Sequence, residues 1–435
     1  MSADQPLIES RVDLSAVRVV MVQQLWRQPE LSDVEAATMA ALERTGALER
    51  ITSGDEIAIT AGSRGIATLP AVLRTVVRAV RDRGGKPFVF PAMGSHGGGT
   101  ADGQRALLAD LGIDEQTIGA PIRSDMSVVQ IGRLATGVPV YLDAQAARAQ
   151  GIIVVNRIKK HTSFDAERES GLCKMAVIGM GKHRQAVTMH RFGNQGLASL
   201  IPEVAACVFE RAPVLAGLAL VENARGGLAS LTGLRPEEIV RAEPDLLRYA
   251  KSLSAKIPFH RIDIGLVELL GKDISGTGMD CYVIGRKRVI AEPEWPEAPE
   301  IHSLVVLRVT PASHGNALGV GLADFTTEAL VREIDWPAVR ANVLASGNME
   351  RGKIPFAYAT DREALEAAGF RERHTSPGDL RLVAIQDTLH LEYLLVSEAL
   401  LPEVLANPDL AVVSTAMALP FDDAGRWHSP FAPRG

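Results

Sequence analysis

The stretch Asn156–Phe164, N-R-I-K-K-H-T-S-F, directly follows the apolar run Gly151–Val155, G-I-I-V-V. Such a run predicts a short buried strand, which places the basic stretch in the loop after it. Lys174, His183 and His190 follow among glycines and aliphatic residues. Cations in a partly buried loop need anionic partners, so the pattern favours an anionic ligand. A basic loop that neutralises acids elsewhere in the fold is the alternative.

The same strand–loop–helix pattern occurs twice upstream. Strands are expected at 56–60 and 86–90, and helices at 69–83 and 101–111. Alternation of short apolar strands with helices predicts a parallel α/β sheet flanked by helices. Ligands of such sheets bind beyond the carboxyl ends of the strands. Three loops should therefore converge on one crevice, and they carry Arg64, His96 and the Lys159–His161 group.

The chain of 435 residues has room for two or three domains. We expect an N-terminal α/β domain at 1–257, beginning with a strand at 17–22 and a helix at 32–45 capped by Ser32. A C-terminal α/β domain at 258–435 should contain strands at 262–267, 283–290 and 303–309, with alternating strands and helices to about Leu419. The crevice is expected between these domains. The tail at 420–435 is expected to be mobile or to return to the N-terminal domain.

Composition narrows the class of protein. A formal net charge of −6 argues against nucleic acid as a partner, because nucleic-acid-binding domains are usually basic. The three cysteines have no metal-ligand spacing and fit a reducing compartment. No signal peptide and no run of 18 apolar residues is visible. We therefore expect a cytoplasmic protein that does not bind membranes.

Two nucleotide-binding motifs are incomplete. The segment Gly179–Arg184, G-M-G-K-H-R, has Arg184 where a dinucleotide fingerprint needs its third glycine. The Walker pattern fails as well, because Ala176 replaces its first glycine and His183 its final Ser or Thr. Neither classical nucleotide site is expected.

The phrases N-R-I-K-x-H-T-S-F at 156–164 and E-S-G-L-x-K-M at 169–175 resemble the nickel-pincer-nucleotide racemases, the lactate racemase family. The step of sixteen residues from Lys174 to His190 matches that family as well. The resemblance extends over most of the chain. One departure is clear: the family's Asp-x-Thr-Arg motif reads Ala61-Gly62-Ser63-Arg64 here, so the contact of its Asp is absent or supplied elsewhere.

The resemblance implies a role for each candidate residue. Lys174 would carry the nickel-pincer nucleotide as a thioamide, and His190 would be the protein ligand to nickel. His96 and His161 would act as bases on opposite faces of the substrate. The remaining contacts to the cofactor or substrate would come from Ser63, Arg64 and Lys272. Read from the residues alone, Arg64 lies in a glycine loop between strand and helix, a setting that favours phosphate, although a loop arginine that caps an acid is the alternative.

The implied function is an isomerase, a lactate racemase-like racemase or epimerase of a 2-hydroxy acid, acting by proton-coupled hydride transfer to the bound nucleotide. Its partners would be a small 2-hydroxy acid, the proteins that make the cofactor, and a second copy of the chain in a homo-oligomer. Lactate, longer hydroxy acids and sugar acids all stay open as substrates. Two other classes also stay open: a cofactor-free binding or sensor protein for an anionic metabolite, and a metal-dependent hydrolase using His96, His161 and His190.

Overall fold

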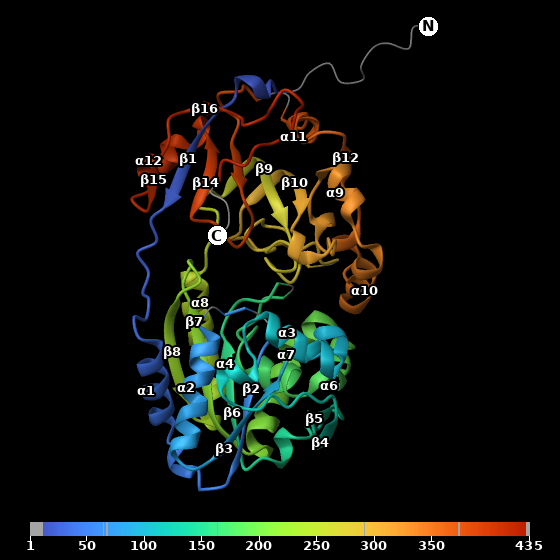
Figure 1. Ribbon diagram of the computed structural model, residues 1–435. Helices are drawn as coiled ribbons and strands as arrows, with labels where there is room; N and C mark the ends of the chain where they lie inside the picture. Colours follow the sequence, from blue (N-terminus) through green and yellow to red (C-terminus); the bar gives the residue numbers. More distant parts are fainter. Residues whose placement is uncertain are drawn as a thin grey trace. The chain divides into compact units, whose positions relative to one another are not determined.

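The computed structural model describes residues 12–63, 65–66, 68–162, 164–290, 292–372 and 375–431. The chain forms two compact units (Figure 1). The N-terminal unit is Gln28–Ser254, and the C-terminal unit combines Met1–Arg27 with Ala255–Gly435. Each unit contains a mostly parallel sheet with helices packed on it, so the expected α/β class is confirmed.

The sheet of the N-terminal unit has the strand order β3-β2-β6-β7-β8. Only β8 runs antiparallel to its neighbour. Its strands are β2 (Glu56–Ala61), β3 (Lys86–Pro91), β6 (Gly151–Arg157), β7 (Val214–Glu222) and β8 (Leu228–Leu234), and β4 (Val128–Arg133) and β5 (Pro139–Asp143) form a separate hairpin. The helices are α1 (Val34–Thr45), α2 (Leu69–Asp82), α3 (Ala101–Asp110), α4 (Glu115–Ile118), α5 (Leu172–Lys174), α6 (Lys182–His190), α7 (Gly193–Arg211) and α8 (Pro236–Leu253).

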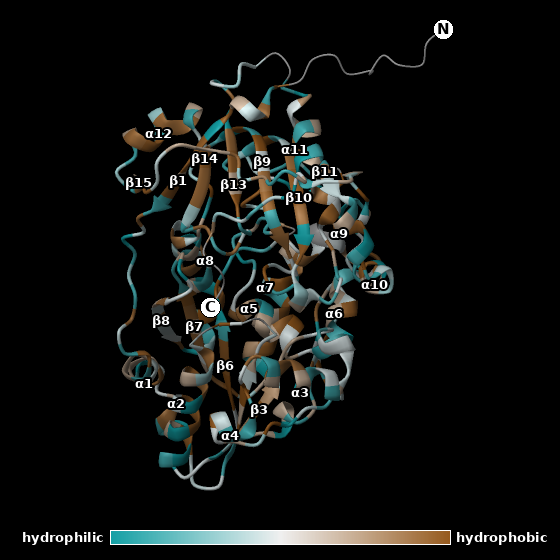
Figure 2. Ribbon diagram, turned by 45° about the horizontal axis from the view of Figure 1, so that its top comes forward, coloured by the Kyte–Doolittle hydropathy of each residue, from teal (hydrophilic) through white to brown (hydrophobic). Residues whose placement is uncertain are grey.

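Both faces of this sheet are buried, which explains the aliphatic run of β6. Ile152 and Val154 belong to one core cluster together with residues of α7 and α8. Ile153 and Val155 belong to the cluster on the opposite face, with residues of α1 and α2. Figure 2 shows β6 as a hydrophobic strand, with helices of mixed hydropathy beside it. The strand predicted from the apolar run is therefore confirmed.

The sheet of the C-terminal unit has the order β12-β11-β10-β9-β13-β14-β1-β15, with β16 paired to β1. The five strands from β12 to β13 are parallel, and the remaining pairings are antiparallel. Its strands are β1 (Arg18–Gln24), β9 (Arg261–Leu270), β10 (Glu300–Val309), β11 (Phe325–Thr327), β12 (Phe356–Tyr358), β13 (Leu382–Ile385), β14 (Tyr393–Ser397), β15 (Leu410–Val412) and β16 (Met417–Ala418). The helices are α9 (Glu328–Glu333), α10 (Trp336–Ser346), α11 (Asp361–Gly369) and α12 (Leu401–Ala406).

Strand β1 lies in a different unit from the one expected for it. The sequence-based division placed the first 27 residues in the N-terminal domain, whereas β1 pairs with β14, β15 and β16. Val19 and Val22 are fully buried in that sheet. These partners are almost 400 residues away along the chain, so the local sequence does not indicate the pairing. The pairing adds antiparallel strands to a sheet that was expected to alternate strand and helix to its end.

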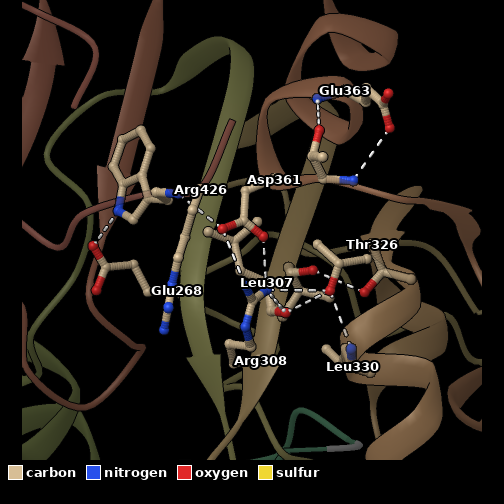
Figure 3. Close-up of polar contacts among 12 residues, drawn as sticks. Glu268, Leu307, Arg308, Thr326, Leu330, Asp361, Glu363 and Arg426 are labelled. Atoms are coloured by element: carbon tan, nitrogen blue, oxygen red, sulfur yellow. Dashed lines mark hydrogen bonds and ion pairs between the residues drawn. The ribbon is translucent and has the colours of Figure 1, made fainter. Parts of the chain in front are cut away.

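The described part of the tail, residues 420–431, packs on the C-terminal unit and neither is mobile nor returns to the other domain. The indole of Trp427 is buried and donates a hydrogen bond to Glu268 on β9, at 2.5 Å (Figure 3). The backbone N–H of Trp427 donates to the Asp361 carboxylate. This carboxylate also accepts two hydrogen bonds from the Arg308 guanidinium, at 2.7 and 3.1 Å. Burial of an indole with its donor satisfied fixes this part of the tail, which is described as far as Phe431.

Two local predictions are wrong. The cap of α1 is Asp33, whose carboxylate accepts the Ala36 N–H, and not Ser32. Residues 283–290 form a turn followed by an irregular segment, and not a strand. Gly285 has a φ of 65°, and a side chain there would collide with the Pro299 carbonyl, so the chain turns at this point and does not continue as a strand. No helix within the described ranges is both long and apolar enough to cross a membrane.

Candidate functional site

Three loops leave the same edge of the N-terminal sheet. Strand β2 pairs in parallel with β3 on one side and with β6 on the other. The segments that follow Ala61, Pro91 and Arg157 therefore start side by side, as the alternation of strands and helices predicted. A Cβ added to Gly62 would lie 3.2 Å from the Met175 side chain, so the first loop also packs against the segment that carries Lys174.

The loop after β3 holds His96 in a glycine-rich turn. Its four glycines, Gly94 and Gly97 to Gly99, all have positive φ, and a Cβ on Gly97 would overlap the backbone of α3. The buried Gln104 amide donates to the Gly94 and His96 carbonyls, at 2.9 and 3.2 Å. The half-buried His96 side chain therefore projects from a backbone that the Gln104 amide holds in place.

The loop after β6 is fixed by a buried carboxylate. Glu169 accepts the backbone N–H of His161 at 2.5 Å and pairs with Lys251 of α8 at 2.6 Å. Burial raises the pKa of Glu169 to about 7, against the lowering effect of Lys251 and the His161 N–H. The half-buried His161 ring stacks on Phe164 with ring centroids 4.2 Å apart. These contacts set both the backbone and the ring plane of His161.

Lys174 ends α5, a single helical turn, and is followed by a π-helical turn, Met175–Gly179. π-helical turns are rare and occur frequently at functional sites. Glu243 of α8, which is almost fully buried, accepts the Cys173 N–H at 2.8 Å within α5. Gly171 leaves space for this carboxylate, because a Cβ there would lie 2.6 Å from the Glu243 carboxyl carbon. Glu243 therefore positions the half-buried Lys174.

Cys173 is not a second reactive group. Burial and the neighbouring Glu243 raise the pKa of its thiol far above the ordinary value. A thiol that stays protonated is a poor nucleophile. Cys173 is a small buried residue of the core.

His190 is the last residue of α6 and lies close enough to Lys174 for their charges to interact. Partial desolvation, and then the positive charge of Lys174, lower the pKa of His190 below its ordinary value. The lowered pKa favours the neutral imidazole at pH 7, which is the form that binds metal ions. The structure thus brings together the lysine and the histidine that the sixteen-residue step singled out.

Lys182 serves the fold and does not belong to the anion-binding candidates. Its fully buried ammonium lies 3.2 Å from the Asp143 carboxylate and donates to the Pro91 carbonyl at 2.6 Å. Burial opposes charge on both partners, lowering the pKa of Lys182 and raising that of Asp143. This pair connects the end of β3 to β5 and to the start of α6.

Lys272 occupies the corresponding edge of the C-terminal sheet, in the loop after β9. Its ammonium donates to the Gly276 carbonyl at 2.7 Å and to the Asn342 side chain at 3.1 Å. The Lys272 N–H donates to the Ser313 hydroxyl, in the loop that follows β10. Lys272 therefore lies beyond the carboxyl ends of two neighbouring parallel strands, as expected for a ligand-binding loop.

Ser63 is partly exposed in the loop after β2. Arg64 lies outside the described residues. In the part of the chain that the structure describes, His96, His161 and His190 do not lie close enough together to share a metal ion. The side chains of Asp263, His302 and Glu372 do lie that close.

Glu169 and Glu243 were missed from the sequence, although both leave a signal. Glu243 lies four residues from Ile239 and four from Leu247, so it interrupts the apolar stripe of α8. Glu169 begins the E-S-G-L-x-K-M phrase, five residues before Lys174. A carboxylate on a buried helix face, near basic loops, indicates a positioning role.

Comparisons with known proteins give one family model and one solved structure that are similar to this chain. Residues 57–231 match the model of a domain of unknown function, DUF362, which covers the sheet and the Lys174–His190 segment. No curated protein matches the chain. The chain is also similar in structure to the lactate racemase apoprotein from Thermoanaerobacterium thermosaccharolyticum, with 14% sequence identity and a TM-score of 0.49. That match covers 89% of this chain and 96% of the other.

Proposed function

We propose that the protein is a racemase or epimerase of a 2-hydroxy acid that uses a nickel-pincer nucleotide joined to Lys174. The observation that carries the proposal is the pairing of a half-buried lysine with a histidine whose pKa that lysine helps to lower.

The residues present fit such a cofactor. The primary amine of Lys174 can form a thioamide, and a neutral His190 can donate a nitrogen to nickel. A single histidine is too poor a donor set to hold nickel, so the nucleotide must supply the other ligands. Glycines at Gly62 and Gly94 bring two loops against the π-helical turn next to Lys174. When bound, the nucleotide would supply an acceptor for hydride from C2 of the substrate.

The remaining chemistry belongs to this chain. His96 and His161, from neighbouring loops, would each take the hydroxyl proton of one enantiomer and return a proton to the other. Neutral imidazoles suit this exchange near pH 7. Ser63, Arg64 and Lys272 would hold the phosphate of the nucleotide or the carboxylate of the substrate. The protein would form a homo-oligomer in the cytoplasm, and it would meet the enzymes that make the cofactor only transiently.

A binding protein for an anionic metabolite is the second candidate. It is favoured by Ala61, which stands where the racemase family has an aspartate next to the cofactor. A protein of this kind would use the same basic loops without any covalent group on Lys174.

Intact mass and nickel content separate the two candidates. The full chain is produced in a host with and without the enzymes that make the nucleotide. With them, the wild-type chain should gain mass and about one nickel per chain, and Lys174→Ala should gain neither. His190→Ala should keep the added mass and lose most of the nickel. Lys86→Ala, at an exposed lysine, is the matched control and should behave as wild type.

A wild-type chain that racemises 2-hydroxy acids at full rate with an unmodified mass would overturn the proposal. An unmodified chain without nickel or turnover that binds anionic metabolites would favour the binding protein.

A further inference from the structure

Asp263, His302 and Glu372 meet at the amino-terminal edge of the C-terminal sheet, opposite the edge that carries Lys272. Ile262 pairs with Ile301 and Ile264 with Ser303, so Asp263 and His302 are register neighbours on parallel strands β9 and β10. Neighbours in register project from the same face of a sheet. Helix α11 packs against both strands (Figure 2), and Glu372 follows its last residue by three positions.

The three side chains are spaced as metal ligands. Each offers one ligand atom, and these atoms lie within 4.8 Å of one another. The His302 Nδ1 and Glu372 Oε1 atoms are 3.3 Å apart. Ligands at about 2.0–2.1 Å from a tetrahedral ion lie roughly 3.3–3.4 Å from each other. One edge of the coordination polyhedron is therefore already formed.

Among the residues that the structure describes, none supplies a positive charge to the Asp263 carboxylate. Its side chain is buried, with 7% of the residue exposed, and within the described ranges its one hydrogen bond comes from the Arg381 N–H, at 2.9 Å. No basic side chain in those ranges forms an ion pair with it. The nearby guanidinium groups are engaged elsewhere: Arg381 pairs with Glu403, and Arg371 donates to the His302 carbonyl. A buried carboxylate needs a compensating charge.

We propose that Asp263, His302 and Glu372 bind one divalent transition-metal ion of the zinc class. One imidazole nitrogen and two carboxylate oxygens suit such an ion, whereas magnesium and calcium prefer oxygen alone. Three protein ligands leave a fourth position for water. The ion connects β9, β10 and the segment after α11, and it is separate from the Lys174 site.

The test uses the full-length chain, stripped with a chelator and produced without the nucleotide. Zinc is titrated by calorimetry, and cobalt is added to follow its visible absorption. The wild type should bind one ion at this site and should melt at a higher temperature with zinc. Loss of a second-shell partner already costs about 10–100-fold in metal affinity. Glu372→Gln and His302→Gln should each weaken binding at least that much.

Two controls separate this site from adventitious binding. Glu333→Gln removes an exposed carboxylate of the same unit and should bind as wild type. His190→Ala removes the candidate nickel ligand of the other unit and should keep the zinc-dependent rise in melting temperature. Circular dichroism checks that each variant is folded. If one of the two ligand variants does not fold, the other is sufficient for the test. Equal zinc affinity in the wild type and in a folded ligand variant would overturn the proposal.

Discussion

Glu169 is the residue through which pH should act on the site. Its carboxylate faces Lys251 of α8, Asp165 of its own loop and the His161 N–H. Burial raises its pKa to about 7 in the folded chain, from an ordinary value of 4.5. Between these two values the folded chain holds a proton that the unfolded chain has lost. The contribution of Glu169 to stability is therefore present below pH 4.5 and is lost as pH rises to about 7.

Replacement of Glu169 by Gln should remove this pH dependence. From pH 5 to pH 8 the unfolding free energy of the wild type should fall relative to Glu169→Gln. The difference should amount to at most about 3 kcal/mol, since one pKa unit corresponds to about 1.4 kcal/mol. Urea unfolding at intervals of one pH unit measures it. Parallel curves for the two proteins would show that the carboxyl titrates normally in the folded state.

The two histidines at the sheet edge should be needed for turnover and not for loading. His96→Asn and His161→Asn should each lower the rate of interconversion by about 10²–10⁴, the usual cost of losing a general base. The added mass on Lys174 should be unchanged. His260→Asn, at an exposed histidine of the other unit, is the control. Near-normal turnover in both variants would remove these residues from the reaction. Initial rates measured from each enantiomer give the comparison.

At the scale of elements, the short helix that carries Lys174 depends on a different helix. Glu243 of α8 accepts the Cys173 N–H at the start of α5, and burial raises the pKa of the Glu243 carboxyl. A neutral amide should therefore replace it at little cost. Glu243→Gln should be close to wild type in stability and in Lys174 loading.

Glu243→Ala should behave differently from Glu243→Gln. It leaves the Cys173 N–H buried without an acceptor, which typically costs about 1–3 kcal/mol. Thermal unfolding measures that loss, and intact mass after expression with the cofactor enzymes measures how much Lys174 is modified. Reduced loading in the Ala variant, restored in the Gln variant, indicates positioning. Equal loading in both would leave Glu243 with a purely structural role.

Elements were predictable where the local pattern had one solution. The apolar runs of β2, β3 and β6 and the amphipathic α2 follow from burial on two faces or on one. The π-helical turn was not predictable, because M-A-V-I-G reads equally as helix or strand. The segment at 283–290 is not the strand that was expected, because its turn depends on Gly285 fitting against Pro299, a contact that the local sequence does not encode.

At the scale of the whole molecule, the composition of the two units was only partly predictable. Parallel α/β architecture follows from alternation along the chain, and so does the edge at which loops 62–63, 92–100 and 158–171 meet. The partners of β1 do not, since antiparallel pairing with β14 joins residues far apart in sequence. The same limit applies to Glu169 with Lys251 and to Glu243 with Cys173, which meet only once α8 has packed.

Packing of the tail through Trp427 should stabilise the C-terminal unit. Trp427 is 7% exposed and satisfies Glu268, a buried carboxyl whose pKa burial raises. Trp427→Phe keeps most of the buried area but removes the donor, so we expect a loss of about 1–3 kcal/mol. Trp427→Ala should cost about 3–5 kcal/mol. Trp336→Ala, at a 38% exposed indole, should stay within about 0.5 kcal/mol of wild type. Urea unfolding with limited proteolysis measures these changes, and a tail that is not docked in solution would make all three variants indistinguishable from the wild type.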